Sequence, residues 1–200
     1  MTDDMWLFEE EAYEGGETAV CGVDEAGRGP LAGPVYAAAV ILPRGLLIPG
    51  LDDSKKLTAK KRDELFDIIR EKAVAYGIAS ATEKEIDEKN ILNATYLAMN
   101  RAMKAMGAPF SLALIDGNRS EGITYPCRCI IGGDGKSESI AAASVLAKVS
   151  RDRYMAELEK KYPGYGFERH KGYGTKAHYA ALRELGPSEA HRLTFLKKMH

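Results

Sequence analysis

Short apolar runs bounded by glycine and proline alternate along this chain with segments of helical periodicity. This alternation restricts the fold strongly, because short β-branched and apolar runs favour strands, whereas apolar residues spaced by three and four favour helices. Strands are predicted at residues 19–24, 34–43, 75–81, 111–116 and 127–131. Helices are predicted at residues 58–73, from 82, at 90–106, at 139–162 and at 175–185.

The order of these elements, without repeats or a linker-like segment, indicates an α/β fold with one mixed sheet flanked by helices and a helical C-terminal part. A chain of 200 residues can be built around one hydrophobic core. Residues 19–200 are therefore expected to form a single domain. Residues 1–18 are acidic and are expected to have little fixed structure.

The net charge of -1 conceals an uneven distribution of charge. Residues 1–20 contain seven acidic residues and no lysine or arginine, whereas residues 148–200 contain twelve basic and six acidic residues. The basic C-terminal third is either a solvated surface or a surface that meets a polyanion. The three cysteines do not form the spaced set of four that a zinc site or a disulfide framework requires.

The longest clean apolar run covers residues 35–42 and is far shorter than the roughly 20 residues that span a bilayer. The acidic N-terminus also lacks the basic start of a signal peptide. A cytoplasmic protein without a membrane partner is expected.

Four acidic residues follow or end predicted strands: Asp24, Glu25, Asp116 and Asp134. Ligands of α/β sheets usually bind beyond the carboxyl ends of the strands, so these acids can converge there. A cation would relieve their repulsion, and oxygen ligands alone favour Mg²⁺ or Mn²⁺. Two such ions held by carboxylates are suited to phosphodiester hydrolysis. The alternative is that the acids serve as helix caps and turn residues, since Asp-Gly pairs are common in turns.

A glycine-rich turn, Gly27-Arg28-Gly29-Pro30, follows the first two acids directly. Glycines let a backbone approach a ligand closely, and backbone groups can contact the 2′-hydroxyl that distinguishes RNA from DNA. Tyr173 lies between two glycines, which leaves its ring free to stack on a sugar or base. A strained hairpin turn and a tyrosine that covers the core are the structural alternatives.

Several basic residues are candidate phosphate contacts, which give affinity without reading sequence. Each can equally be an ordinary surface charge. The candidates are Lys55, Lys56, Lys148, Lys171, Arg151 and Arg153.

Taken together, these segments closely resemble the bacterial ribonuclease HII family over most of residues 19–195. The first motif that carries the resemblance runs through residues 22–35 and contains the acidic pair and the glycine-rich turn. The others are Asp53-Ser54-Lys55-Lys56-Leu57, Ile115-Asp116-Gly117, Gly133-Asp134, Ser139-Ile140-Ala141-Ala142-Ala143-Ser144, Ala147-Lys148-Val149, Tyr165-Gly166-Phe167 and His170-Lys171-Gly172-Tyr173-Gly174-Thr175.

The resemblance implies a ribonuclease H-like five-stranded sheet and an endonuclease that cuts the RNA strand of RNA/DNA hybrids. It also implies incision 5′ of single ribonucleotides in duplex DNA, which leaves 3′-hydroxyl and 5′-phosphate ends. The implied site has two Mn²⁺ or Mg²⁺ ions on Asp24, Glu25, Asp116 and Asp134. In such a site Gly27, Arg28 and Gly29 grip the 2′-hydroxyl, and Tyr173 stacks on the next deoxyribose. A monomer without an obligatory protein partner is expected.

The sequence departs from the family pattern in two places. Many relatives carry Lys-Gly-Asp where this chain has Gly132-Gly133-Asp134, which removes one positive charge beside the acids. The acidic residues 1–18 lie outside the match. Ribonuclease HIII is similar around the first acids but lacks the Gly-Arg-Gly turn, which disfavours it here.

Two other functions compete with this interpretation. One is a hybrid-binding module without catalysis, in which the acids are structural; the four matched acids argue against it. The other is a nuclease that acts on DNA. Such an enzyme needs no contact to a 2′-hydroxyl, so the Gly-Arg-Gly turn and Tyr173 distinguish the two.

Overall fold

The computed structural model describes residues 5–51 and 57–197. Five strands of these residues form one mixed sheet, as predicted. Each strand lies within two residues of its predicted bounds. The strands are β1 (Val20–Ala26), β2 (Val35–Ile41), β3 (Ala75–Ala81), β4 (Leu112–Asp116) and β5 (Cys127–Ile130).

The strand order β3-β2-β1-β4-β5 places β1 in the middle of the sheet. β1 runs antiparallel to β2 and parallel to β4. Val23 is the register partner of Ile115, so the residues that follow them, Asp24 and Asp116, come to the same edge of the sheet. The parallel pairing of β1 with β4 is therefore what brings two acids together from positions far apart in the sequence.

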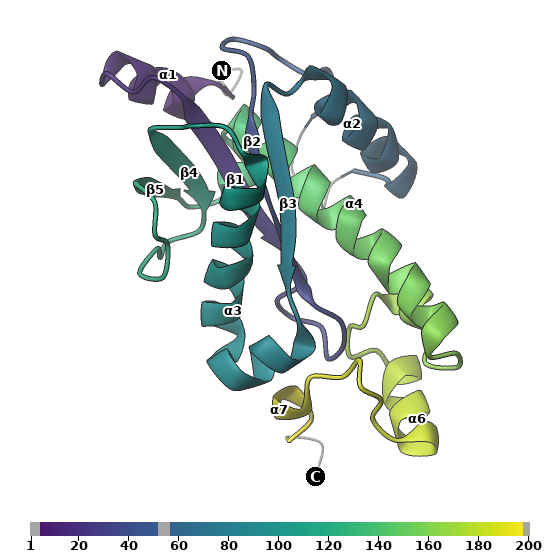
Figure 1. Cartoon of the computed structure of the whole chain (residues 1–200). Helices are drawn as coiled ribbons and strands as arrows, with labels where there is room; N and C mark the ends of the chain where they lie inside the picture. Colours follow the sequence, from purple (N-terminus) through teal and green to yellow (C-terminus); the bar gives the residue numbers. More distant parts are fainter. Residues whose placement is uncertain (1–4, 52–56, 198–200) are drawn as a thin grey trace.

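Helices cover both faces of the sheet (Figure 1). α3 (Glu83–Met106) packs on one face, and α4 (Glu138–Lys161) packs on the other together with α2 (Ala59–Lys72). Alternate residues of β2 belong to the two cores, as the two-residue period of a strand requires. The other helical segments of the described residues are α1 (Leu7–Glu14), the 3-10 turn η1 (Gly133–Gly135), α5 (Phe167–His170), α6 (Lys176–Leu185) and α7 (Leu193–Leu196).

The helix ends follow local sequence signals. Thr58 caps α2 by accepting a hydrogen bond from the Lys61 amide. Thr82 and Glu85 form the predicted capping box, and α3 is broken at Asn90, where a new helix was predicted to begin. α3 ends at Gly107, whose φ of 70° is left-handed. The methionines predicted to form a core stripe are buried on this helix.

The expectation of little fixed structure in residues 1–18 is wrong for Leu7–Glu14, which form α1. The helix is held by long-range contacts. Trp6 is buried and donates its indole N–H to the Leu46 carbonyl at 2.8 Å. Glu9 is also buried, and its Oε1 accepts hydrogen bonds from the hydroxyls of Ser137 and Ser139 at 2.6 Å each.

The C-terminal part is helical, as predicted. A separate apolar cluster joins Met155 and Leu158 of α4 to Phe167 and Leu182. In Figure 1, α6 and α7 accordingly lie beyond the C-terminal end of α4, on the side where the turn between β1 and β2 projects from the sheet. Over the described ranges, every helix is too short or too polar to cross a lipid bilayer.

Candidate active site

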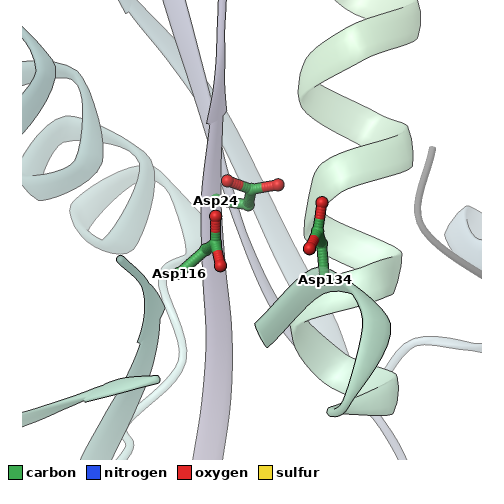
Figure 2. A group of neighbouring side chains, drawn as sticks. All are labelled: Asp24, Asp116 and Asp134. Carbon is green, nitrogen blue, oxygen red and sulfur yellow. The ribbon is translucent and has the colours of Figure 1, made fainter. Parts of the chain in front are cut away.

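Three aspartates from three different elements meet at the edge of the sheet (Figure 2). Asp24 lies in β1, Asp116 ends β4, and Asp134 lies in η1 just before α4. One carboxylate oxygen of each aspartate lies within 4.8 Å of the other two. The structure therefore brings together three of the four acids that were predicted to converge.

Close contact between β1 and α4 positions Asp24. A Cβ at Gly22 would overlap the backbone of Ser139 and Ile140, so only glycine lets the helix pass this near the strand. Ser144 of α4 then reaches Asp24 and donates a hydrogen bond to it. The Glu25 amide donates another to Asp24 Oδ1 at 2.7 Å.

A backbone contact joins the other two aspartates. The amide of Gly133 donates to Asp116 Oδ1 at 2.7 Å, which ties η1 to the end of β4. Ser137 caps α4 directly after η1 by accepting from the Ile140 amide at 3.2 Å. Asp134 is thus held between a capped helix and a strand end, and its position does not depend on a flexible loop.

Burial raises the pKa of Asp24 well above its ordinary value, and the nearby charges of Glu25 and Asp116 raise it further. Side chains arranged in this way repel one another when ionised, and a bound cation would remove the repulsion. All the donors are carboxylate oxygens, the ligands that Mg²⁺ and Mn²⁺ prefer. The site therefore fits hard divalent cations.

Glu25, the fourth predicted ligand, lies beside this group and not within it. Its Oε1 is 3.2 Å from Arg28 Nη1. It nevertheless lines the same cleft as Asp24 and Asp116. Arg28 therefore competes with any cation for this carboxylate in the structure as it stands.

A single cleft contains most of the predicted substrate-binding residues together with three of the four predicted acids, Asp24, Glu25 and Asp116. Tyr173 is 46 % exposed, and its ring lies over the turn, since a Cβ built on Gly29 would be 3.5 Å from Tyr173 Cε1. Gly27 has a φ of 97°, a conformation that favours glycine. The predicted residues that line the cleft are Asp24, Glu25, Gly27, Arg28, Gly29, Asp116, Lys148, Arg151 and Tyr173.

The predicted lysines do not share one location. Lys148 lines the cleft and forms an ion pair with Asp152 at 2.7 Å. Lys171 lines a different groove, between α2 and α4. Lys55 and Lys56 lie outside the described residues, so their predicted role has no structural counterpart here.

Arg151, a candidate phosphate contact, lies at the wall of the cleft, but its side chain is almost fully buried and is bonded to the protein backbone. Arg151 is 1 % exposed. Its guanidinium donates hydrogen bonds to the carbonyls of Ala32, Pro34 and Lys171 at 3.2, 3.0 and 3.0 Å. The spacing of basic residues gives no indication of this burial, which arises from tertiary packing.

The family model for ribonuclease HII matches residues 21–200. The chain belongs to the ribonuclease HII family. A curated ribonuclease HII from Caldicellulosiruptor bescii is 53% identical over 197 residues, which cover 98% of this chain and 96% of that protein. A ribonuclease HII from Paraburkholderia xenovorans is 58% identical over 184 residues, which cover 92% of this chain and 74% of that protein.

The fold of this ribonuclease HII also matches a solved relative. The crystal structure of ribonuclease H2 from Pyrococcus horikoshii aligns with a TM-score of 0.75 at 26% identity, over 88% of this chain and 93% of that one. The predicted ribonuclease H-like sheet and the assignment to hydrolytic endonucleases that act on RNA are confirmed. Membership of the family also implies activity on RNA/DNA hybrids and dependence on a divalent metal.

Two residues of the site were given no role from the sequence. Ser144 hydrogen-bonds to Asp24, although in the sequence it was only the last residue of the motif Ser139-Ile140-Ala141-Ala142-Ala143-Ser144. Arg192 is 0 % exposed and contacts the Gly-Arg-Gly turn. It was counted only as one charge of the basic C-terminal third, so sequence spacing carried no signal for its position.

Proposed function

We propose that this ribonuclease HII cuts the RNA strand of RNA/DNA hybrids and also incises duplex DNA 5′ of a single embedded ribonucleotide. Cleavage leaves 3′-hydroxyl and 5′-phosphate ends. The observation that carries the proposal is that one cleft contains Asp24, Glu25 and Asp116, the Gly-Arg-Gly turn and Tyr173, with Asp134 grouped next to two of these acids. The groups suited to hydrolysis thus lie within reach of the groups suited to recognising ribose.

Asp24, Glu25, Asp116 and Asp134 would hold two divalent ions, Mn²⁺ or Mg²⁺. Ions held in this way activate water for in-line attack on a phosphodiester and stabilise the leaving oxygen. The protein supplies a fixed arrangement of carboxylates, because Ser144 and the Glu25 amide orient Asp24 and the Gly133 amide orients Asp116. Such preorganisation avoids the cost of ordering the ligands during the reaction.

The Gly27-Arg28-Gly29 turn would contact the 2′-hydroxyl of the ribonucleotide. A 2′-hydroxyl both donates and accepts hydrogen bonds, so backbone groups of a rigid turn can recognise it. Tyr173, half-exposed beside this turn, would stack on the next deoxyribose. The enzyme would therefore bind best at a junction where ribose is followed by deoxyribose.

Phosphate contacts would come from Lys148 within the cleft and from Lys171 in the neighbouring groove. Lys55 and Lys56 are assigned the same role from sequence alone. Because such contacts do not read sequence, they would position any duplex of suitable shape. We assign the enzyme to the cytoplasm as a monomer that needs no protein partner for cleavage.

The test uses three labelled duplexes with Mn²⁺ or Mg²⁺: an RNA/DNA hybrid, a DNA duplex with one ribonucleotide, and an all-DNA duplex. We expect cuts in the first two only, with the second cut immediately 5′ of the ribonucleotide. Asp24→Asn should abolish cleavage, whereas Asp63→Asn, the same change at an acid outside the cleft, should not. Binding without cleavage would support a binding module, and equal cleavage of all duplexes would support a DNA nuclease.

A further inference from the structure

The carbonyl groups of the Gly-Arg-Gly turn are occupied by a buried side chain from the other end of the chain. Arg192 is 0 % exposed. Its Nη2 donates to the Gly27 carbonyl at 2.6 Å, its Nη1 to the Arg28 carbonyl at 2.9 Å, and its Nε to the Gly33 carbonyl at 2.8 Å. One guanidinium thus links the start of the turn to Gly33, which lies shortly before β2.

The guanidinium of Arg192 is itself fixed in place. The Arg192 amide donates to the Leu31 carbonyl at 2.9 Å, and the preceding residue, His191, forms a β-bridge with Ala32. The ring of Phe195 lies 5.2 Å from the guanidinium carbon. These contacts hold the Arg192 backbone against the turn, so its side chain has little freedom to follow a displaced carbonyl.

Stability alone does not explain why a guanidinium occupies this position. Among the described residues, no carboxylate forms an ion pair with Arg192, although the charge is fully buried. The carboxylates of Glu83 and Asp87 act on it only from beyond ion-pair distance, so the cost of removing this charge from water is only partly offset. Burial and the nearby Arg151 accordingly lower the pKa of Arg192 to about 9. What the guanidinium gains in exchange is three carbonyl acceptors, two of them in the Gly-Arg-Gly turn, which points to a role in holding that turn.

Peptide geometry shows what the contact achieves. In a planar trans peptide the C=O of one residue and the N–H of the next point in opposite directions. Because Arg192 holds the carbonyls of Gly27 and Arg28, the amides of Arg28 and Gly29 point away from it. Within the described ranges, these two amides donate no hydrogen bond to the protein, and both residues line the cleft.

We infer that Arg192 is a positioning residue for ribose recognition: by gripping the carbonyls of Gly27 and Arg28, it aims the amides of Arg28 and Gly29 at the 2′-hydroxyl. This inference rests on the proposed function of the turn. Lysine cannot replace arginine here, because a single ammonium group lacks the planar fork that reaches three separate carbonyls. Arg192 does not touch the substrate and acts only through the backbone.

The test compares Arg192→Lys with Leu182→Ala, which disturbs the same C-terminal cluster without touching the turn. Two quantities are measured: kcat/KM on a duplex with one ribonucleotide, and the inhibition constant of an all-DNA duplex as competitor. We expect Arg192→Lys to lower kcat/KM about tenfold or more, the equivalent of one lost hydrogen bond to the substrate. The inhibition constant should change less than about twofold, as should both quantities in Leu182→Ala.

An unchanged kcat/KM in Arg192→Lys, or an equal loss of affinity for the all-DNA duplex, would overturn the inference. An equal loss of kcat/KM in Leu182→Ala would do the same. If the wild-type enzyme does not distinguish the two duplexes, the proposed function itself fails. If Arg192→Lys does not fold, the wild type is studied by NMR instead. The measurement is of couplings across the hydrogen bonds from the Arg192 Nη atoms to the Gly27 and Arg28 carbonyls. The absence of these couplings would overturn the inference.

Discussion

Replacing Asp24 with asparagine is expected to stabilise the metal-free protein at neutral pH while it abolishes cleavage. Asp24 is 3 % exposed, and its carboxylate faces those of Glu25 and Asp116. Two unit charges 4.8 Å apart repel by about 3.5 kcal/mol at an effective dielectric constant of about 20. Asparagine has a similar shape and no charge, and its oxygen can still accept the hydrogen bond from the Glu25 amide.

Part of this repulsion is already relieved by protonation and solvent, so the expected gain in unfolding free energy is about 1–3 kcal/mol. For a chain of this size that corresponds to a rise in Tm of roughly 3–10 °C. The raised pKa of Asp24 sets the direction of the pH dependence. The destabilisation caused by the ionised Asp24 is absent below the ordinary pKa of about 3.9 and grows as the pH rises from there to the raised pKa. The stability that Asp24→Asn gains over the wild type should therefore vanish near pH 4.

The assay is thermal unfolding at pH 7.5 in EDTA and again in Mn²⁺, with Asp63→Asn as the matched control. A cation bound only to the folded protein stabilises it by about 2.7 kcal/mol at a concentration of 100 times its Kd. Mn²⁺ should therefore raise the Tm of the wild type and the control more than that of Asp24→Asn, which reverses the order seen in EDTA. The reasoning is refuted if Asp24→Asn is less stable in EDTA, or if all three proteins gain equally from Mn²⁺.

Three further changes test other parts of the structure. Burial raises the pKa of Glu138 to about 7, so its ionised carboxylate lowers the stability of the folded protein above that pH and has no such effect below 4.5. The unfolding free energy of Glu138→Gln, measured with urea, should therefore exceed that of the wild type by up to about 3 kcal/mol at pH 8 and by nothing at pH 4.5. Gly27→Ala should lower the unfolding free energy by about 2 kcal/mol or more in the same assay, because alanine is strained at this φ and its Cβ would overlap Arg151. A variant as stable as the wild type would contradict this. Tyr173→Phe should keep hybrid affinity within about threefold, whereas Tyr173→Ala should lose about 1–3 kcal/mol of binding; equal losses would argue for the hydroxyl over the ring.

The arrangement of the sheet and the long helices was predictable because local signals agree with the fold. The Thr82 and Glu85 capping box, the break at Asn90 and the cap at Gly107 all lie where the pattern placed a helix boundary. The meeting of the acids was predictable from their places after predicted strands, since ligands of α/β sheets bind beyond the carboxyl ends of the strands. The pairing of β1 with β4 that brings Asp24 and Asp116 together was known only from the structure. The geometry of Glu25 was not, because its contact with Arg28 depends on the exact path of the turn.

The rest of the site could not be predicted because it depends on contacts between distant parts of the sequence. Glu9 belongs to the acidic residues 1–18, which were expected to have little fixed structure, yet it is buried and accepts hydrogen bonds from Ser137 and Ser139, about 130 residues away. Arg151 and Arg192 looked like surface charges of a basic segment and prove to be buried. Composition and spacing do not indicate which charged residue has enough carbonyl partners to be buried, so this information exists only in the folded chain.

The contact between Arg192 and the β1–β2 turn also sets an order of events during translation. A ribosome releases the two halves of the site far apart in time, because Arg192 follows Arg28 of the turn by 164 residues. A nascent chain, or one truncated before this arginine, would have its acidic residues but no support for the turn. If the role proposed for Arg192 is correct, competence to recognise ribose would arise only after this residue has been synthesised and has docked on the turn.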